Sequence, residues 1–474
     1  MSTAEANPNS ELTPGGPPFA SEAAQRGDRA FLGHPKGLGY LSFVEGCERF
    51  SYYSMQTLLV LYMVKYLLLP ENIGNVAGLQ SLQNGWYSGL EGQPLASAIF
   101  GDYTALVYLT PILGGIIADR WLGRRATLIL GGLVMALGHF LMAIESMFLF
   151  ALLALVVGVG LFKGNIATQV GELYGPNDLR RAMAFQIFYI AIQVSVIAAP
   201  LVSGSLGEGV GWHYGFGCAG LVMVAGLVLY IYAKPWLPQE DRSRRDKATG
   251  PSAKLQRQDL PRLFVVLALI PVLALALLVN QEIFNAYLVW ADERFQLTFF
   301  GKTLPTSWMI TIDATASFTM LLAVTAFWKI YADRRGTEPD ELGKMIIGSL
   351  FTIAGGMCLV IAAATNGGGD EKIGLFWPVM FHILNSIGFA HTLPVSLALF
   401  TKVAPKALAA TIVGLYYLAF FAANKIVGTI GGWYSTMDTT QFWLLHVAAS
   451  AAGLAAFLVL KLTLGRVLRG PEPA

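Results

Sequence analysis

The stretch YLTPILGGIIADRWLGRR, Tyr108–Arg125, is an apolar segment that ends abruptly in a basic loop. A shorter copy of its last part, ADRRG at Ala332–Gly336, follows another apolar segment in the second half of the chain. An ordinary basic loop would explain each copy separately. Two adjacent glycines precede the first loop, and Asp119 and Gly123 follow at fixed spacing within it. This combination favours a specific motif instead. The repeat predicts a chain built from two similar halves.

The composition of the chain is typical of a protein embedded in a membrane. Of its 474 residues, 55% are hydrophobic and only 13% are charged, whereas about a quarter of the residues in a soluble domain are charged. The apolar runs are about 20 residues long, which is the length that spans a bilayer as a helix. The basic residues lie in the loops between these runs and form no clustered face, so nucleic acid is not an expected partner.

The sequence contains no pattern that indicates a metal, a cofactor or an enzyme. Cys47, Cys218 and Cys358 lie far apart, each within an apolar run. That spacing gives neither a disulfide framework nor a CxxC metal site. The histidines show no ligand spacing, and the chain has no GxSxG motif and no phosphate-binding loop. We expect no metal, no cofactor and no enzymatic activity.

Hydropathy predicts an all-α membrane protein with twelve spanning segments. All of them should be helical, because backbone polar groups cannot stay unpaired in lipid. The segments lie near residues 38–68, 95–118, 125–144, 147–172, 183–204, 213–235, 262–290, 305–331, 343–365, 373–402, 408–433 and 440–464.

One long charged segment divides the spans into six and six. This predicted linker, residues 236–261, is too short to hold two further spanning helices. The first residues are rich in Pro, Gly, Ser and Ala and lack the regions of a secretory signal peptide, which predicts a disordered cytosolic tail. The predicted organisation is a tail at 1–37, six-helix bundles at 38–235 and 262–464, and a second cytosolic tail at 465–474.

Basic residues concentrate in every second connection between spans. Arg124, Arg180, Arg245, Arg334 and Lys402 belong to such connections, and the alternate connections hold few basic residues. Because positively charged loops stay on the cytosolic side, the basic connections and both termini are expected to face the cytosol. We therefore predict a multi-pass protein of the cell membrane. We also expect it to function as a monomer.

Two six-helix halves, with an Asp-Arg…Gly-Arg-Arg loop after the second span, resemble the major facilitator superfamily. The resemblance implies the major facilitator fold, in which twelve helices form two bundles. It also implies a substrate cavity between the bundles, near the middle of the bilayer.

The first span carries ionisable residues within VEGCERFSYY, Val44–Tyr53. On a helix, Glu45, Glu48, Arg49 and Tyr53 follow one another at spacings of three or four residues, so they share one face. Charged side chains inside a membrane are costly and usually functional. The alternative is a structural ion-pair stripe between helices, but two acids against one arginine leave a carboxylate free to titrate.

Lys163 is an isolated cation well inside the fourth span. Such a side chain needs an anion, and Glu45 or Glu48 is the natural partner. Loss of that pair by protonation would couple proton movement to a conformational change. The alternative is that Lys163 extends to the cytosolic edge of the membrane, although the helix continues for about ten residues on either side.

Several segments, in order, resemble the proton-dependent oligopeptide transporter family. Its first-helix motif ExxERFxYY is matched at every fixed position, by Glu45, Glu48, Arg49, Phe50, Tyr52 and Tyr53. FKGNIATQVGELY is similar to the family's fourth-helix signature, YLTPILGGIIADRWLG to its second-to-third-helix segment and IFYIAIQVS to its fifth-helix signature. The match is looser in the second half. The resemblance implies a symporter that imports di- and tripeptides by alternating access, with protons as the coupling ion.

The resemblance also implies roles for residues of the first half. Glu45 and Glu48 would take part in proton coupling together with Lys163. Arg49 and Lys163 would face the carboxylate of the peptide, for which an arginine fork and a lysine point charge are well suited. Tyr53 and Tyr108 would contact the peptide backbone.

The second half departs from the family pattern at two anchors. The seventh helix of the family carries a Glu-Gln pair, which here stands reversed as Gln281-Glu282. A shift of one residue rotates a carboxylate by about 100° around a helix, so Glu282 does not match the family's coupling acid in position. We keep Glu282 as a candidate for proton coupling and Gln281 as a candidate for substrate binding. The tenth-helix glutamate that holds the peptide amine is replaced by Phe389.

Asp313 is the candidate replacement for that missing acid. The segment LPTSWMITIDA, Leu304–Ala314, resembles a family segment with asparagine at the position of Asp313, and that asparagine helps to hold the same amine. We expect Asp313 to supply the anionic anchor. Lys425 of the eleventh helix would weaken this anchor if it paired with Asp313; extension toward the membrane surface is the equal alternative.

Two further possibilities stay open at this point. Gln193 stands where the fifth helix of the family has asparagine, and it either reshapes the substrate site or is a tolerated neighbour. The altered amine anchor also leaves room for the same fold and proton coupling with another anionic substrate, such as nitrate or a conjugated acid.

Overall fold

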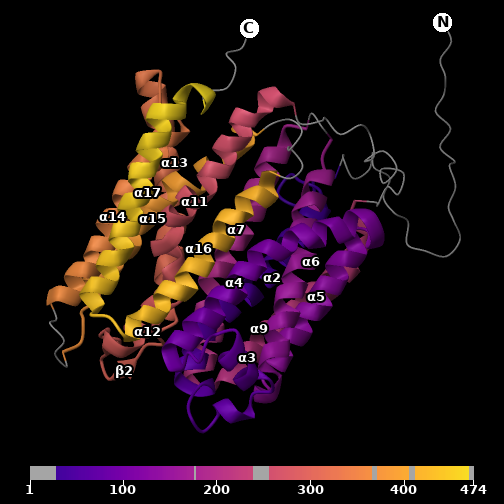
Figure 1. The fold of residues 1–474 in the computed structure, drawn as a ribbon. Helices are drawn as coiled ribbons and strands as arrows, with labels where there is room; N and C mark the ends of the chain where they lie inside the picture. The colour runs from indigo at the N-terminus through magenta and orange to yellow at the C-terminus, as the bar shows by residue number, and fades with distance from the viewer. Residues whose placement is uncertain (1–27, 176–177, 239–255, 366–370, 405–411, 469–474) are drawn as a thin grey trace, which may run out of the picture.

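The computed structural model describes residues 28–175, 178–238, 256–365, 371–404 and 412–468, and most of these belong to long helices packed side by side (Figure 1). The first six long helices are α2 (Lys36–Tyr62), α4 (Gly92–Ile117), α5 (Arg124–Leu141), α6 (Phe148–Glu172), α7 (Arg180–Ala199) and α9 (Trp212–Tyr232). The last six are α11 (Leu260–Glu282), α13 (Trp308–Arg335), α14 (Glu341–Thr365), α15 (Phe376–Val403), α16 (Ile412–Gly431) and α17 (Thr439–Leu468). The predicted helical architecture is confirmed.

Eleven helices within the described residues are long and apolar enough to cross a membrane. The remaining long helix, α2, has 27 residues but contains Glu45, Glu48 and Arg49 in its middle, and these side chains lower its hydropathy. Together they give the twelve spans expected from the sequence.

The bundle has two distinct ends. We call the end that holds the start of α2 and the end of α17 the termini end, and the opposite end the hairpin end (Figure 1). The hairpin end carries the short helices α3 (Leu79–Gly85) and α12 (Ala286–Arg294). It also carries an antiparallel pair of two-residue strands, β1 (Thr298–Phe299) and β2 (Lys302–Thr303), which the hydropathy did not predict.

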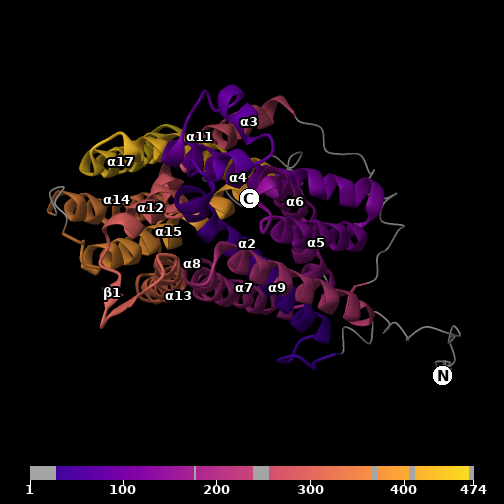
Figure 2. The same ribbon diagram turned by 90° about the horizontal axis from the view of Figure 1, so that it is seen from below.

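The long helices form two groups that meet along two seams. In the end-on view, α2, α4, α5, α6, α7 and α9 lie together, and α13, α14, α15 and α17 lie on the other side (Figure 2). Contacts between the groups run along α4 and α16, and along α7 and α13. The side chains of these four helices and of α2 therefore border the interface between the halves.

Both copies of the basic loop end at a glycine with a positive φ. In the first copy a π-helical turn, Ala118–Leu122, is followed by Gly123 with φ of 85°. In the second copy α13 ends at Gly336 with φ of 70°. Residues with a side chain rarely adopt such angles, so glycine lets the chain leave one helix and enter the next. The two copies thus share a positive-φ glycine after the helix, although ψ differs, at 157° for Gly123 and −3° for Gly336.

A close helix crossing on α4 gives a testable consequence. A Cβ on Gly114 would lie 1.9 Å from the backbone oxygen of Gly160 on α6, whereas one on the adjacent Gly115 would meet nothing within 4 Å. We expect Gly114→Ala to destabilise the protein by about 1–3 kcal/mol, as overpacking does. Gly115→Ala should be neutral or slightly stabilising, because alanine favours a helix. Thermal unfolding midpoints of the two purified variants check this, and equal midpoints would contradict the packing described.

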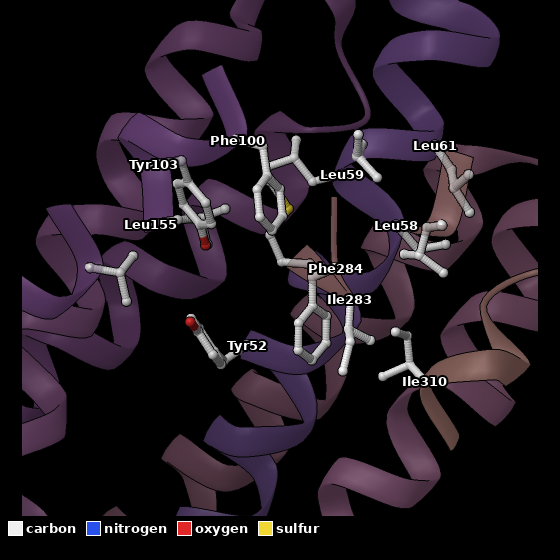
Figure 3. Close-up of a cluster of buried hydrophobic side chains, with 14 of the residues drawn as sticks. Tyr52, Leu58, Leu59, Leu61, Phe100, Tyr103, Leu155, Ile283, Phe284 and Ile310 are labelled. Atoms are coloured by element: carbon white, nitrogen blue, oxygen red, sulfur yellow. The ribbon is translucent and has the colours of Figure 1, made fainter. Parts of the chain in front are cut away.

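Apolar side chains join the two halves near the hairpin end. Figure 3 shows Phe284 and Ile283, from the segment between α11 and α12, among residues of α2, α4 and α13. Leu58 and Phe100 are completely buried there, as are Ile283 and Ile310. Since all of them belong to one hydrophobic cluster, the halves share a continuous core at this end.

The structure differs from the predicted boundaries in three main places. The seventh span is not one helix, because α11 ends at Glu282 and α12 begins at Ala286. Residues 28–35, predicted as part of a disordered tail, form a turn in which His34 contacts the hydroxyl of Tyr174 at 2.8 Å. α17 continues to Leu468, beyond the predicted end at 464. The described residues leave out most of both predicted tails, 1–27 and 469–474, and most of the predicted linker. The expectation that this linker holds no further helices is therefore not tested.

Candidate functional site

The charged stripe of α2 forms a compact ion-paired cluster. The Nε of Arg49 lies 2.9 Å from Oε1 of Glu45 and 2.5 Å from Oε2 of Glu48. All three side chains are buried, and Glu48 is 0% exposed. Because Glu45, Glu48 and Arg49 stand one turn or less apart on one face of the helix, a single guanidinium serves two carboxylates. The predicted shared face is confirmed as a geometric arrangement.

The tyrosines after this cluster connect it to the other half of the molecule. The guanidinium carbon of Arg49 lies 5.6 Å from the ring centroid of Tyr52. Tyr53 packs edge-on against Tyr52, with centroids 5.1 Å apart, and faces Phe284 between α11 and α12 at 6.3 Å. The stripe therefore borders the interface between the halves.

Lys163 of α6 is surrounded by tyrosine rings. Its Nζ lies 4.6 Å from the ring centroid of Tyr108 on α4, and 5.7 Å from those of Tyr52 on α2 and Tyr417 on α16. An ammonium over aromatic faces is stabilised by their quadrupoles. Tyr417 is the one member that the sequence did not suggest, because nothing in α16 marks which of its aromatic residues faces Lys163.

Lys163 makes no ion pair with an acid in this conformation. Within the described part of the chain, no carboxylate oxygen lies within 4.0 Å of its Nζ. Glu45 and Glu48 still act on it electrostatically. The predicted pairing of Lys163 with one of these acids therefore stays a prediction, to be tested in another conformation.

Tyr108 marks the point where the two halves come closest beside Lys163. Its ring stacks on Phe420 of α16, with centroids 4.8 Å apart, and lies 6.2 Å from Tyr417. Gln193, by contrast, is half-buried on α7 and makes no side-chain hydrogen bond to another described residue. The two alternatives for Gln193 stay open.

The reversed Gln281-Glu282 pair points in two directions at the end of α11. Gln281 accepts a hydrogen bond from the amide of Asn424 on α16, at 3.3 Å. Glu282 is completely buried and lies 3.3 Å from Nε2 of His446 on α17. The one-residue shift thus directs the carboxylate toward α17 and Gln281 toward α16.

Asp313 of α13 is the first of three buried side chains that are linked by hydrogen bonds. Its Oδ1 lies 2.9 Å from Nδ1 of His382 on α15. Nε2 of His382 lies 2.7 Å from the hydroxyl of Tyr287 on α12. A neutral imidazole satisfies both contacts, since it donates from Nδ1 to the carboxylate and accepts from the tyrosine at Nε2. Asp313 can therefore remain an anion without an ammonium or guanidinium partner.

His382, the partner of Asp313, lies on the same helix as Phe389. His382 and Phe389 are seven residues apart on α15, which places them on the same helix face. Phe389 stands at the position of the missing glutamate and is a half-buried apolar residue packed against the core of the second half. Asp313 also acts electrostatically on Tyr53 of α2.

Lys425 does not pair with Asp313. It forms an ion pair with Asp102 of α4, whose other carboxylate oxygen accepts a hydrogen bond from the indole of Trp86 at 2.9 Å. The pair lines a cleft of about 530 Å³ between α4 and α16, near the hairpin end. Of the two alternatives for Lys425, pairing with Asp313 is therefore not what the structure shows, because its counterion lies on the other half.

Polar contacts hold the two halves together at the hairpin end. Lys65, just after α2, lies 2.7 Å from Oδ1 of Asp292 on α12. The two carboxylate oxygens of Glu208, on the short helix α8 (Ser205–Gly209), accept the backbone N–H groups of Thr306 and Ser307 at 2.8 and 2.9 Å. These two residues precede α13, so an acid from one half caps a helix of the other.

The described residues contain no group of three or more His, Cys, Asp or Glu side chains that could hold a metal ion. The acids and histidines of the site are arranged in pairs with arginine, tyrosine or each other. The chemistry available to this arrangement is the binding of charged groups and the transfer of protons.

Comparison with known proteins gives consistent results along nearly the whole chain. A model of the Major Facilitator Superfamily matches residues 43–429. A peptide transporter of Yersinia enterocolitica subsp. palearctica is 29% identical over 476 residues, which cover 86% of this chain and 89% of that protein. A di-/tripeptide transporter of Lactococcus lactis subsp. cremoris is 28% identical, over 88% of this chain and 93% of that protein.

Solved structures give the same result. A mutant of the peptide transporter POT in complex with alafosfalin matches with a TM-score of 0.80 and 26% identity, over 95% of this chain and 99% of that one. The same transporter in complex with sulfate matches with a TM-score of 0.78 and 26% identity, over 93% and 96% of the two chains.

Proposed function

This chain belongs to the major facilitator superfamily and, within it, to the proton-dependent oligopeptide transporter family, and we propose that it imports di- and tripeptides together with protons by alternating access. The observation that carries the proposal is the buried cluster in which one arginine is shared by two acids on α2. Such a cluster can exchange a proton for a peptide carboxylate.

The carboxylate end of the peptide would bind between Arg49 and Lys163. Arg49 offers a planar fork that matches a carboxylate, and Lys163 adds a point charge that no acid neutralises by direct contact in the described structure. Tyr53 and Tyr108 flank these cations at the interface and have hydroxyl groups suited to the peptide backbone. Gln193 and Gln281 are the further proposed contacts.

The amine end would bind to Asp313 on the opposite half. The carboxylate is oriented by His382 and, among the described residues, has no lysine or arginine side chain within ion-pair distance. Because a zwitterionic peptide would then touch acids of one half and cations of the other, its binding would favour states in which the halves close around it.

Proton coupling would follow from competition for Arg49. While no peptide is bound, Arg49 forms ion pairs with both Glu45 and Glu48. A peptide carboxylate that engages the guanidinium would leave one buried acid without its counterion, and such an acid binds a proton more tightly. Glu282 is the further acid proposed to take part, together with Lys163.

The direction of the chain in the membrane follows from the basic loops. The termini end carries Arg124, Arg180 and Arg334 near helix ends, and positively charged connections stay in the cytosol. We therefore place both termini in the cytosol of a cell membrane. The contacts of Lys65 and Glu208 would then close the outer side of the transporter, which acts as a monomer.

Competition experiments distinguish peptide import from transport of another anion. We expect unlabelled di- and tripeptides to compete with radiolabelled dialanine for uptake into proteoliposomes, and nitrate to have no effect. N-acetyl-dialanine should compete far less well, because it lacks the amine that Asp313 would bind. Equal competition by the acetylated peptide, or strong inhibition by nitrate, would favour the alternative substrate class.

A further inference from the structure

Glu282 and His446 form an isolated acid–base pair inside the second half. Their side chains are 0% and 1% exposed, and Oε2 of Glu282 lies 3.3 Å from Nε2 of His446. Glu282 is the last residue of α11 and His446 lies in α17. Neither residue belongs to the cluster of Glu45, Glu48 and Arg49.

The hydrogen bonds of the imidazole fix the number of protons in this pair. Nδ1 of His446 lies 2.9 Å from the backbone oxygen of Phe442, which can only accept. Nδ1 must therefore carry a hydrogen. If Nε2 and the carboxylate were both without a proton, two lone pairs would face each other in a buried site. One proton is therefore shared between Glu282 and His446, whichever of the two holds it.

The surroundings offer this proton no other charged partner. Among the described residues, Glu282 and His446 make no ion pair except with each other. The imidazole packs against the rings of Phe442 and Trp443, at centroid distances of 4.6 and 5.3 Å. On the side of α16, the neighbour of Glu282 is Gly431. The charged residue of that helix, Lys425, is paired with Asp102 instead.

The other carboxylate oxygen ties the pair to the break between α11 and α12. Oε1 of Glu282 accepts the N–H of Ala286, the first residue of α12, at 3.1 Å. A carboxylate at a helix N-terminus is stabilised by the helix dipole, and protonation weakens that interaction. α12 also carries Asp292, the partner of Lys65 in the first half. The protonation state of the pair is thus connected to a contact between the halves.

We propose that His446 completes a second proton-binding site with Glu282, and that this site holds one proton in the present conformation and releases it when α12 moves. The proposal rests on the proposed function, since it assigns the second proton site of a symporter. It differs from the predicted role of Glu282 alone, because the histidine of α17 makes the proton a shared one.

The transport test separates proton coupling from peptide translocation. Gradient-driven uptake of dialanine needs proton release, whereas counterflow into vesicles preloaded with dialanine does not. We expect Glu282→Gln and His446→Gln each to lower the ratio of gradient-driven uptake to counterflow by about tenfold or more. The double variant should be no worse than the poorer single variant, because both changes remove the same proton.

His139→Gln is the matched control. His139 is also 0% exposed, but its Nε2 contacts the hydroxyl of Ser51, at 2.5 Å, and no acid. We expect its ratio of uptake to counterflow to match that of the unchanged protein. A normal ratio in His446→Gln, or equal loss of uptake and counterflow, would overturn the proposal.

Ring-nitrogen NMR tests the pair without any transport. In protein labelled with ¹⁵N-histidine, the signal absent from His446→Gln identifies His446. We expect that signal to show a protonated Nδ1 and a hydrogen-bonded Nε2, and to move in Glu282→Gln but not in Glu48→Gln. An unmoved signal in Glu282→Gln would reject the shared proton. The NMR result does not depend on transport of dialanine. Failure of the shared proton can therefore be distinguished from failure of the proposed function.

Discussion

Asp313→Asn is expected to reduce dialanine uptake to background in proteoliposomes. The change keeps the size of the side chain and its contact with His382, but it removes the anion proposed to hold the peptide amine. Loss of one partner from a buried, hydrogen-bonded charge pair costs about 2–5 kcal/mol, which corresponds to a loss of affinity of about 30-fold or more. Direct binding of N-acetyl-dialanine to the purified variant should change little, because that peptide has no amine for Asp313 to hold.

The control for this prediction lies on the same helix. Asp333 is an exposed acid near the end of α13, and Asp333→Asn makes the same chemical change away from the proposed site. We expect normal uptake from Asp333→Asn. Near-normal uptake by Asp313→Asn, with normal protein level and insertion, would show that the amine is held elsewhere.

Glu48→Gln is expected to abolish the accumulation of dialanine driven by a proton gradient. The glutamine fills the same space beside Arg49, but it can neither neutralise the guanidinium nor bind a proton. Glu48 is 0% exposed and lies 2.5 Å from Nε of Arg49, so solvent water does not reach the carboxylate to replace it. Gradient-driven uptake should fall by about tenfold or more relative to counterflow.

An exposed acid beyond the same helix provides the comparison. Glu71 lies in the loop after α2 and is exposed, so Glu71→Gln should leave both uptake and counterflow unchanged. Thermal unfolding of Glu48→Gln controls for a folding defect. If a folded Glu48→Gln protein still accumulated dialanine to the level of the unchanged protein, Glu48 would not be a coupling residue.

The features that the sequence predicts well are those set by local spacing. The ion-paired face of α2 follows from three residues within one helical turn, and the basic loops follow from glycine and arginine positions that recur. Both depend on geometry within a few residues, which a helix fixes regardless of its neighbours. The twelve-helix architecture follows in the same way from apolar lengths.

The features that the sequence cannot predict depend on which helices meet. Lys425 finds its counterion in Asp102, more than half the chain away, and Lys163 contacts a tyrosine of α16. His382 and His446 carry no motif, yet each is the partner of an acid. The direction of Glu282 also depends on the break after α11, which hydropathy does not reveal, since apolar residues continue on both sides of it.

Accumulation of radiolabelled dialanine against its concentration gradient is the most direct measurement of proton-coupled peptide import. Proteoliposomes with an acidic exterior and an alkaline interior should concentrate dialanine above the external level. A protonophore, or equal pH on both sides, should reduce the final level to simple equilibration. Uptake that reaches the same final level with and without the proton gradient would contradict the coupling proposed for Glu45, Glu48 and Arg49.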